Sequence, residues 1–119
     1  MRRPVVALAV LALLALAAAG ASAAVSARSK TRVVKVGDDY FSAAKLTVKA
    51  GTRIRWSWLA DNADSHDVRL KSGPRGVKKF HSELAASDFS YSQTLKKPGT
   101  YRIYCSIHAL MRETIVVKR

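Results

Sequence analysis

The sequence predicts an all-β protein, an antiparallel β-sandwich, from three observations. After residue 30, short segments alternate apolar and polar residues with a period of two, which is typical of half-buried strands. Turn-forming residues separate these segments, among them Gly51 and the pair Pro98-Gly99. No repeat of fixed period is visible, and only residues 82–87 are compatible with a helical turn. Many short strands joined by turns favour two packed antiparallel sheets.

The first three predicted strands precede the middle of the chain. Residues 31–36, TRVVKV, are short and rich in β-branched valine. Residues 45–49, KLTVK, alternate a long or polar side chain with leucine or valine. Residues 52–58, TRIRWSW, alternate in the same way. Since Trp56 and Trp58 fall on the apolar face of this last segment, we expect both to pack in the core.

Four further strands are predicted in the second half. Residues 66–71, HDVRLK, follow a polar loop, and residues 88–95, DFSYSQTL, align aromatic residues on one face. Residues 100–105, TYRIYC, follow the Pro-Gly turn, and residues 113–118, ETIVVK, end the pattern. The alternation within TYRIYC places Cys105 on the inward face, at the end of its strand.

The N-terminus has the layout of a secretory signal peptide. Two arginines precede an apolar run at residues 5–19, and an Ala-Ser-Ala motif ending at Ala23 fits a cleavage site. The apolar run is short for a membrane span, which needs roughly 20 residues, but an uncleaved anchor is the alternative. We expect a signal peptide at 1–23, a basic flexible tether at 24–30 and one domain at 31–119. The protein would then be exported to the periplasm, the cell surface or the medium.

The chain is strongly basic. It has 21 lysines and arginines against 8 acidic residues. Without the two leader arginines the net charge is 21 − 2 − 8, or about +11. Such a charge favours acidic protein partners, anionic cell-wall polymers or membrane surfaces. Nucleic acid is the other usual partner of a basic chain, but an exported protein rarely meets it. We expect a monomer.

Cys105 is the only cysteine, so it cannot form an internal disulfide. In an exported protein an unpaired thiol can oxidise or pair between chains, and a metal bond would protect it. His108 and Met111 follow at intervals of three. We expect them in a short loop before the last strand, folded back toward the sulfur. If the strand that opens with His66 pairs beside the strand of Cys105, all four side chains meet at one end of the sandwich.

Two imidazoles, a thiolate and a thioether form a donor set that suits copper in both of its oxidation states. Zinc accepts two histidines, a cysteine and water, but gains nothing from Met111. A cysteine hydrolase needs an accessible thiolate, whereas Cys105 is expected to point inward. The chain has 3 histidines, too few for the copper clusters of a multicopper oxidase. His81 matches no ligand position and is expected on the surface.

These residues resemble those of the cupredoxins, the small blue copper proteins, and most closely the plastocyanin and amicyanin group. The resemblance rests on PGTYRIYCSIHALM at 98–111 and on the upstream SHDV at 65–68, and it covers roughly residues 31–118. It implies a Greek-key sandwich, one copper ion, and single-electron transfer between redox proteins without conversion of a substrate. The ligands that it implies are His66, Cys105 and His108 in the equatorial plane and Met111 on the axis.

The sequence departs from the family pattern at several positions. Asp67 stands where the family often has an asparagine that ties the ligand loops together. If ionised, Asp67 would lower the reduction potential; otherwise it acts only as a loop tie. Many relatives carry Pro-Gly and Gly around the axial ligand, where this chain has Ala109, Leu110 and Glu113. A copper-delivery protein on the same scaffold is the alternative function. The intact ligands argue against a metal-free interaction domain.

Overall fold

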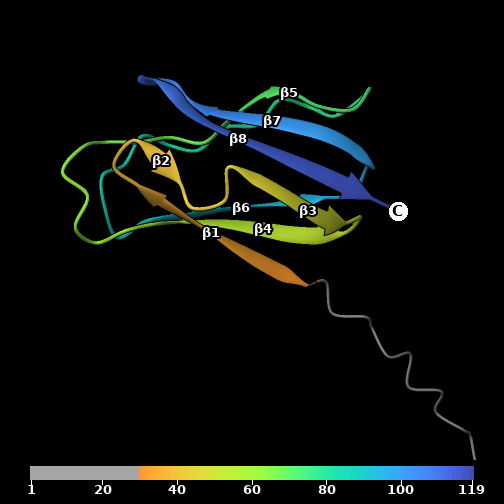
Figure 1. Ribbon diagram of the computed structural model, residues 1–119, viewed down its shortest axis with the longest axis horizontal. Coiled ribbons are helices and arrows are strands. Elements are labelled where there is room, and N and C mark those ends of the chain that lie inside the picture. The colour runs from red at the N-terminus through yellow and green to blue at the C-terminus, as the bar shows by residue number, and fades with distance from the viewer. Residues whose placement is uncertain (1–29) are drawn as a thin grey trace, which may run out of the picture.

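The computed structural model describes residues 30–119, which form two four-stranded sheets packed face to face (Figure 1). The first sheet has the order β2-β1-β4-β6 and the second the order β3-β8-β7-β5. The strands are β1 (Thr31–Gly37), β2 (Tyr40–Phe41), β3 (Lys45–Lys49), β4 (Thr52–Trp58), β5 (Arg69–Ser72), β6 (Ser90–Leu95), β7 (Gly99–Cys105) and β8 (His108–Lys118). The predicted all-β sandwich is confirmed.

The predicted signal peptide at 1–23 and residues 24–29 of the predicted tether lie outside the described residues. Between residues 30 and 119 the structure contains no helix with the length and apolar character of a membrane span.

Each sheet contains one parallel pair, so the sheets are mixed rather than purely antiparallel as predicted. β1 pairs in parallel with β4, and β3 pairs in parallel with β8. The other strand pairs are antiparallel. After β1 the chain crosses to the second sheet as β3 and returns as β4, so β1 and β4 run in the same direction. Alternation within one segment shows which face is buried, but it does not reveal the direction of the neighbouring strand.

The strand boundaries follow the prediction closely in the first half, where β3 and β4 coincide with the predicted segments. The short strand β2 was not predicted. It forms because Asp39 adopts a left-handed φ of 66°, which turns the chain back against β1. The predicted strand at 88–95 begins only at Ser90, after Asp88 with a positive φ of 50°.

The predicted strand at 66–71 was wrong at its start, because β5 begins at Arg69. His66 and Val68 instead bond to the segment 82–85, with the His66 N–H donating to the Ala85 carbonyl over 2.8 Å. This pairing also explains why residues 82–87 form no helical turn. The backbone of residues 82–85 lies beside the chain that leads into β5. The Ser82 hydroxyl also accepts a hydrogen bond from the Val68 N–H.

The core lies between the two sheets and is built from the inward residues of the alternating segments. Trp56 and Trp58 pack there as predicted, with 0% and 4% exposure. The Trp56 indole N–H donates to the Glu113 carboxylate over 2.9 Å, which joins β4 to β8 across the core. The other apolar core residues are Val34, Val36, Phe41, Val48, Ile54, Val68, Leu70, Leu95, Tyr101, Ile103, Cys105, Met111, Ile115 and Val117.

The two ends of the sandwich carry different connections. At one end β7 ends at Cys105 and β8 begins; we call this the Cys105 end. At the opposite end the chain enters β1 from Lys30 and leaves β8; we call this the Lys30 end. Figure 1 shows the start of β1 and the C-terminus together at the Lys30 end.

Candidate metal centre

The predicted ligands come from three places at the Cys105 end. Cys105 is the last residue of β7, and His108 is the first residue of β8, after a two-residue turn. The two face each other across this turn, where the register of the hairpin shifts. His66 precedes β5 and is held by two backbone bonds to Ala85, of 2.8 and 3.1 Å. The hairpin and the His66 segment therefore approach each other from different parts of the chain.

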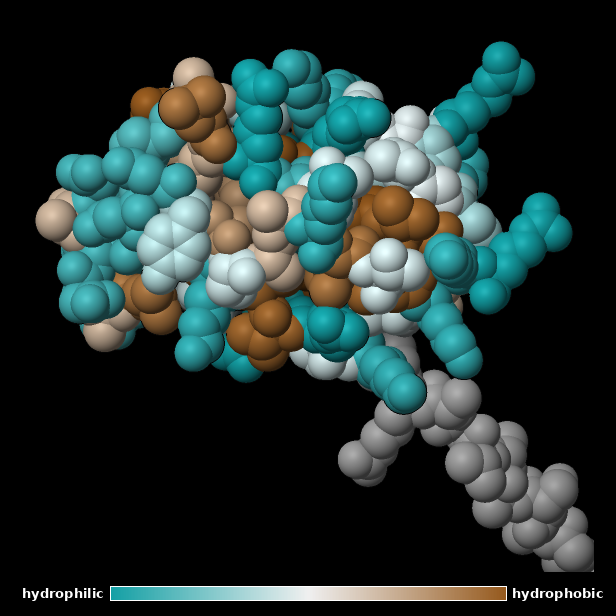
Figure 2. Space-filling view, viewed as in Figure 1, coloured by the Kyte–Doolittle hydropathy of each residue, from teal (hydrophilic) through white to brown (hydrophobic). Residues whose placement is uncertain are grey.

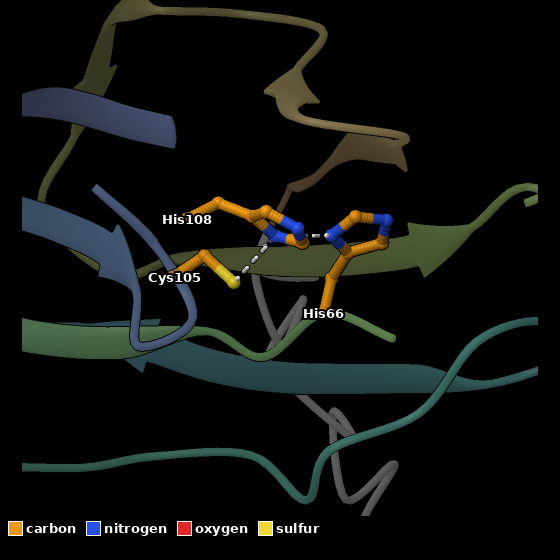
Figure 3. Close-up of side chains that lie close together, drawn as sticks. All are labelled: His66, Cys105 and His108. Atoms are coloured by element: carbon orange, nitrogen blue, oxygen red, sulfur yellow. Dashed lines mark hydrogen bonds between the residues drawn. The ribbon is translucent and has the colours of Figure 1, made fainter. Parts of the chain in front are cut away.

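The donor atoms of His66, Cys105 and His108 converge (Figure 3). The two imidazole Nδ1 atoms lie 3.1 Å apart, and the Cys105 Sγ lies 3.6 Å from the His108 Nδ1. All three atoms lie within 4.8 Å of one another. His66 and Cys105 are buried, while the His108 side chain keeps 24% exposure. The sequence made the meeting conditional on a strand beside that of Cys105, and β5 does pair with β7, although His66 itself lies before β5.

Met111 is buried, with 1% exposure. The predicted loop containing His108 and Met111 is wrong, because β8 begins at His108 and includes both residues. From Met111 onward, every second residue of β8 points into the core. The thioether is therefore inside the protein at the Cys105 end, three residues beyond His108. Its place as a fourth ligand stays a prediction.

Comparison with known proteins agrees with this geometry. The family model described as a cupredoxin-like domain matches residues 6–117. The chain belongs to the cupredoxin-like domain family. An amicyanin-alpha from Methylorubrum extorquens is 34% identical over 85 residues, which are 71% of this chain and 70% of the relative. An amicyanin from Paracoccus versutus is 28% identical over 86 residues, 72% of this chain and 64% of the relative.

Solved amicyanin structures share the fold of this cupredoxin domain. A reduced variant of amicyanin superposes with a TM-score of 0.65 at 27% identity, over 74% of this chain and 82% of that chain. A Cu(I) form of another amicyanin variant superposes with the same TM-score, over 76% of this chain and 84% of that chain. The predicted resemblance to the cupredoxins is therefore confirmed.

A carboxylate lies beside the Nε2 atom of each imidazole ring in this cupredoxin domain. The His66 Nε2 lies 2.8 Å from Asp38 Oδ1, and the His108 Nε2 lies 3.1 Å from Asp39 Oδ1. A carboxylate beside Nε2 favours the tautomer with its proton there, which leaves the Nδ1 lone pair free. Two such lone pairs and a cysteine sulfur then face one another, which is a donor set that suits a soft cation. Cys105 also lies too deep, at 1% exposure, to act as an accessible nucleophile.

Asp38 is itself held firmly in place. It accepts bonds from the Ala63 and Asp64 N–H groups, over 2.9 and 3.1 Å. The Ala63 bond, the His66 ring and the Asp64 bond together lower the pKa of Asp38 to about 2. Asp38 is therefore ionised at neutral pH and can orient His66. Neither Asp38 nor Asp39 was predicted, since their only signal in the sequence is a Gly-Asp-Asp turn between two strands, which says nothing about a partner.

Asp67 ties the two ligand-bearing segments of the cupredoxin domain together. Its carboxylate accepts bonds from the Ser106 N–H over 2.7 Å, the Ser106 hydroxyl over 2.6 Å and the Arg69 side chain over 2.8 Å. Burial raises the pKa of Asp67, but the bonds from Ser106 and Arg69 outweigh it and hold the pKa below its ordinary value. Asp67 is thus a loop tie and an ionised group at once. His81, by contrast, is exposed and lies outside the converging group, as predicted.

Proposed function

We propose that the protein is an exported copper protein that carries single electrons between redox proteins. One copper would be held by His66, Cys105, His108 and Met111. The observation that carries the proposal is the convergence of two imidazole Nδ1 atoms and one cysteine sulfur within 4.8 Å. Similarity to amicyanins, of which Cu(I) forms are among the solved structures, supports the choice of copper over zinc.

The bound ion would supply a couple between Cu(I) and Cu(II), and a site of two histidines, a cysteine and a distant methionine is tolerated by both states. The chain's part is to keep the donor atoms still. The Trp58 indole N–H donates to the His66 carbonyl over 3.0 Å, which fixes that segment to the core. Cys105 and His108 are fixed by the hairpin of β7 and β8. Electron transfer of this kind converts no substrate, so the protein would act as a carrier and not as an enzyme.

Electrons would pass through the exposed edge of His108. Among the described residues, Leu110 and Ile107 are large apolar side chains with 93% and 52% exposure, and both lie within two residues of His108. A partner that covers this apolar surface would bring its own redox centre close to the ring. The net positive charge of the chain suggested partners with acidic surfaces, but the connections around His108 contain seven acidic residues and no lysine or arginine. A partner that docks at His108 would therefore present a neutral or basic surface. Association with a basic partner should then slow as salt rises, since the screening length is about 10 Å at 0.1 M.

The metal proposal is tested by adding Cu(II) to the purified chain from Ala24 onward and recording visible and electron paramagnetic resonance spectra. We expect an intense thiolate-to-copper band. Cys105→Ser should abolish this band, while His81→Ala, which changes the one histidine outside the group, should leave it unchanged. A colourless wild-type protein without bound copper would refute the assignment.

The carrier and delivery functions separate by a second measurement. A carrier keeps its copper through repeated reduction and oxidation, whereas a delivery protein passes the ion to an acceptor apoprotein. Export is tested by N-terminal sequencing of the protein recovered outside the cytoplasm. We expect Ala24 as the first residue, and an intact leader would indicate the anchored form instead.

A further inference from the structure

The basic side chains gather at the Lys30 end. This end is formed by the start of β1, the turn between β3 and β4, the turn between β6 and β7, the first part of the loop after β5 (residues 73–78) and the C-terminus. Backbone bonds join these parts: the Arg53 N–H donates to the Lys30 carbonyl, and the Ala50 N–H to the Lys118 carbonyl. The loop after β5 is attached by Lys97, whose ammonium donates to the Arg75 carbonyl over 2.9 Å.

No acidic residue occurs in any of these connections. Their basic side chains are all exposed, and Figure 2 shows long hydrophilic side chains projecting from this end. The basic residues of the Lys30 end are Lys30, Lys49, Arg53, Arg75, Lys78, Lys96, Lys97, Lys118 and Arg119.

The Cys105 end has the opposite charge. The connections there are residues 38–39, 59–68, 82–89 and 106–107, and they contain no lysine or arginine. All acidic residues of the chain except the buried Glu113 lie in these connections. The net positive charge that the sequence suggested as a docking signal therefore does not surround His108.

At ordinary salt concentrations, the charge of one end does not affect a surface that approaches the other end. β8 has 11 residues and runs from one end to the other, so at about 3.3 Å per residue the ends are about 33 Å apart. Charges are screened over about 10 Å at 0.1 M salt. A surface that approaches the Lys30 end therefore meets a positive charge, and one that approaches the Cys105 end meets a negative charge.

We propose that the Lys30 end binds the surface of an anionic phospholipid bilayer and thereby holds the Cys105 end, with its metal centre, away from the membrane. The large apolar side chains that are exposed between residues 30 and 119 are Val33, Tyr40, Leu84, Ile107 and Leu110, and none of them belongs to the connections of the Lys30 end.

This lack of an apolar anchor decides between a protein and a lipid partner. Protein interfaces take most of their affinity from a few buried aromatic or apolar anchors. A bilayer surface attracts basic residues without any such anchor. The course of the chain agrees, because the residues that precede β1 enter at this end and include Arg28 and the apolar run at 5–19. If the leader stayed in a membrane, the Lys30 end would lie against that membrane. The basic residues of this end would bind the membrane surface even after the leader had been cleaved.

The test measures the binding of the chain from Ala24 onward to vesicles. Every core residue lies between Val34 and Val117, so this chain contains the whole sandwich. The vesicles contain equal amounts of phosphatidylglycerol and phosphatidylcholine, with pure phosphatidylcholine as the neutral reference. One variant carries Lys96→Gln, Lys97→Gln and Lys118→Gln. Its matched control carries Lys35→Gln, Lys45→Gln and Lys71→Gln, three exposed lysines outside the Lys30 end, and has the same net charge.

We expect sedimentation with the anionic vesicles only, and loss of binding at high salt. Each basic residue near an anionic surface contributes roughly fivefold in affinity, so the first variant should bind on the order of 100-fold more weakly than wild type. The control variant should bind nearly as wild type does. In the bound protein, hydrogen exchange should slow in residues 96–100 and stay unchanged in residues 59–65.

Other outcomes would overturn the inference. Equal weakening of both variants would show attraction by net charge without a preferred end. Equal binding to neutral vesicles, or protection of residues 59–65, would exclude the proposed orientation. Capture by an acidic protein or an anionic cell-wall polymer without any binding to the vesicles would assign the Lys30 end to that partner. None of these results depends on a bound metal, so the proposed copper function stands or falls separately.

Discussion

Glu113 is predicted to make the protein less stable as the pH rises toward neutrality. This side chain lies in the core with 1% exposure, where Trp56 donates one bond to its Oε1. Its second oxygen, Oε2, has no hydrogen-bond partner among the described residues. Burial raises the pKa of Glu113 from 4.5 to about 7, although the Trp56 bond acts in the opposite direction. The folded protein therefore keeps a proton that the unfolded chain releases.

The sign and size of the effect follow from this difference in pKa. Below about pH 4.5 the Glu113 carboxyl is protonated in both states, so its burial causes no pH-dependent loss of stability there. Between pH 4.5 and about 7, unfolding releases a proton, so the free energy of unfolding falls as the pH rises. A pKa difference of about 2.5 at about 1.4 kcal/mol for each pKa unit gives a loss of about 3–4 kcal/mol above pH 7.

The perturbation is Glu113→Gln, which keeps an acceptor for Trp56 and cannot ionise. Urea unfolding of the metal-free protein, followed by circular dichroism, gives the free energy of unfolding at about pH 4 and about pH 8. The stability of the variant relative to wild type should increase by about 3–4 kcal/mol between these two conditions. Glu83→Gln, at an exposed position, is the matched control and should show no such change. Equal pH dependence in wild type and Glu113→Gln would refute the reasoning.

Three further predictions concern the surroundings of the metal centre. Asp67→Asn should raise the reduction potential measured by voltammetry, because it removes a negative charge that favours the oxidised ion. The rise should be smaller than for an unpaired carboxylate, because Arg69 pairs with Asp67 over 2.8 Å and offsets part of its charge. An unchanged or lower potential would leave Asp67 as a loop tie only. Asp38→Asn should weaken copper binding by about 10- to 100-fold in a chelator competition, since it alters the partner of the His66 Nε2. Trp58→Phe should lower the free energy of unfolding by about 1 kcal/mol, because the His66 carbonyl loses its indole donor and keeps only the bond from the Ala85 N–H; an unchanged urea midpoint would contradict this.

The sequence was sufficient where one local rule decides the structure. Alternation placed the two tryptophans and Cys105 in the core, and the spacing of Cys105 and His108 predicted their meeting across a turn. The intervals between Cys105, His108 and Met111 are the same whatever residues lie between them, so the pattern could be recognised despite the departures at Ala109 and Leu110. The meeting of Cys105 and His108 was therefore predictable from alternation and spacing, whereas that of His66 with them depended on which strands pair.

The rest depends on contacts between distant parts of the chain. The parallel direction of β1 against β4 follows from a crossing between sheets, which leaves no periodic signal in either strand. Asp38 reaches His66 across 28 positions, and Asp67 reaches Ser106 across 39 positions. The separation of charge between the two ends was also hidden, because net charge is a sum and carries no position.

The central place of β8 has a consequence for how the molecule forms. β8 lies between β3 and β7, so the second sheet is divided until the last strand has been made. Its parallel partner begins at Lys45, which pairs with Thr114, and contacts of such long range form slowly. During synthesis the nascent chain thus has neither a complete sheet nor His108 until its final residues emerge. If the protein is exported as proposed, this delay would be useful, because an unfolded chain can pass through a narrow channel, and His66, Cys105 and His108 would come together only after the passage.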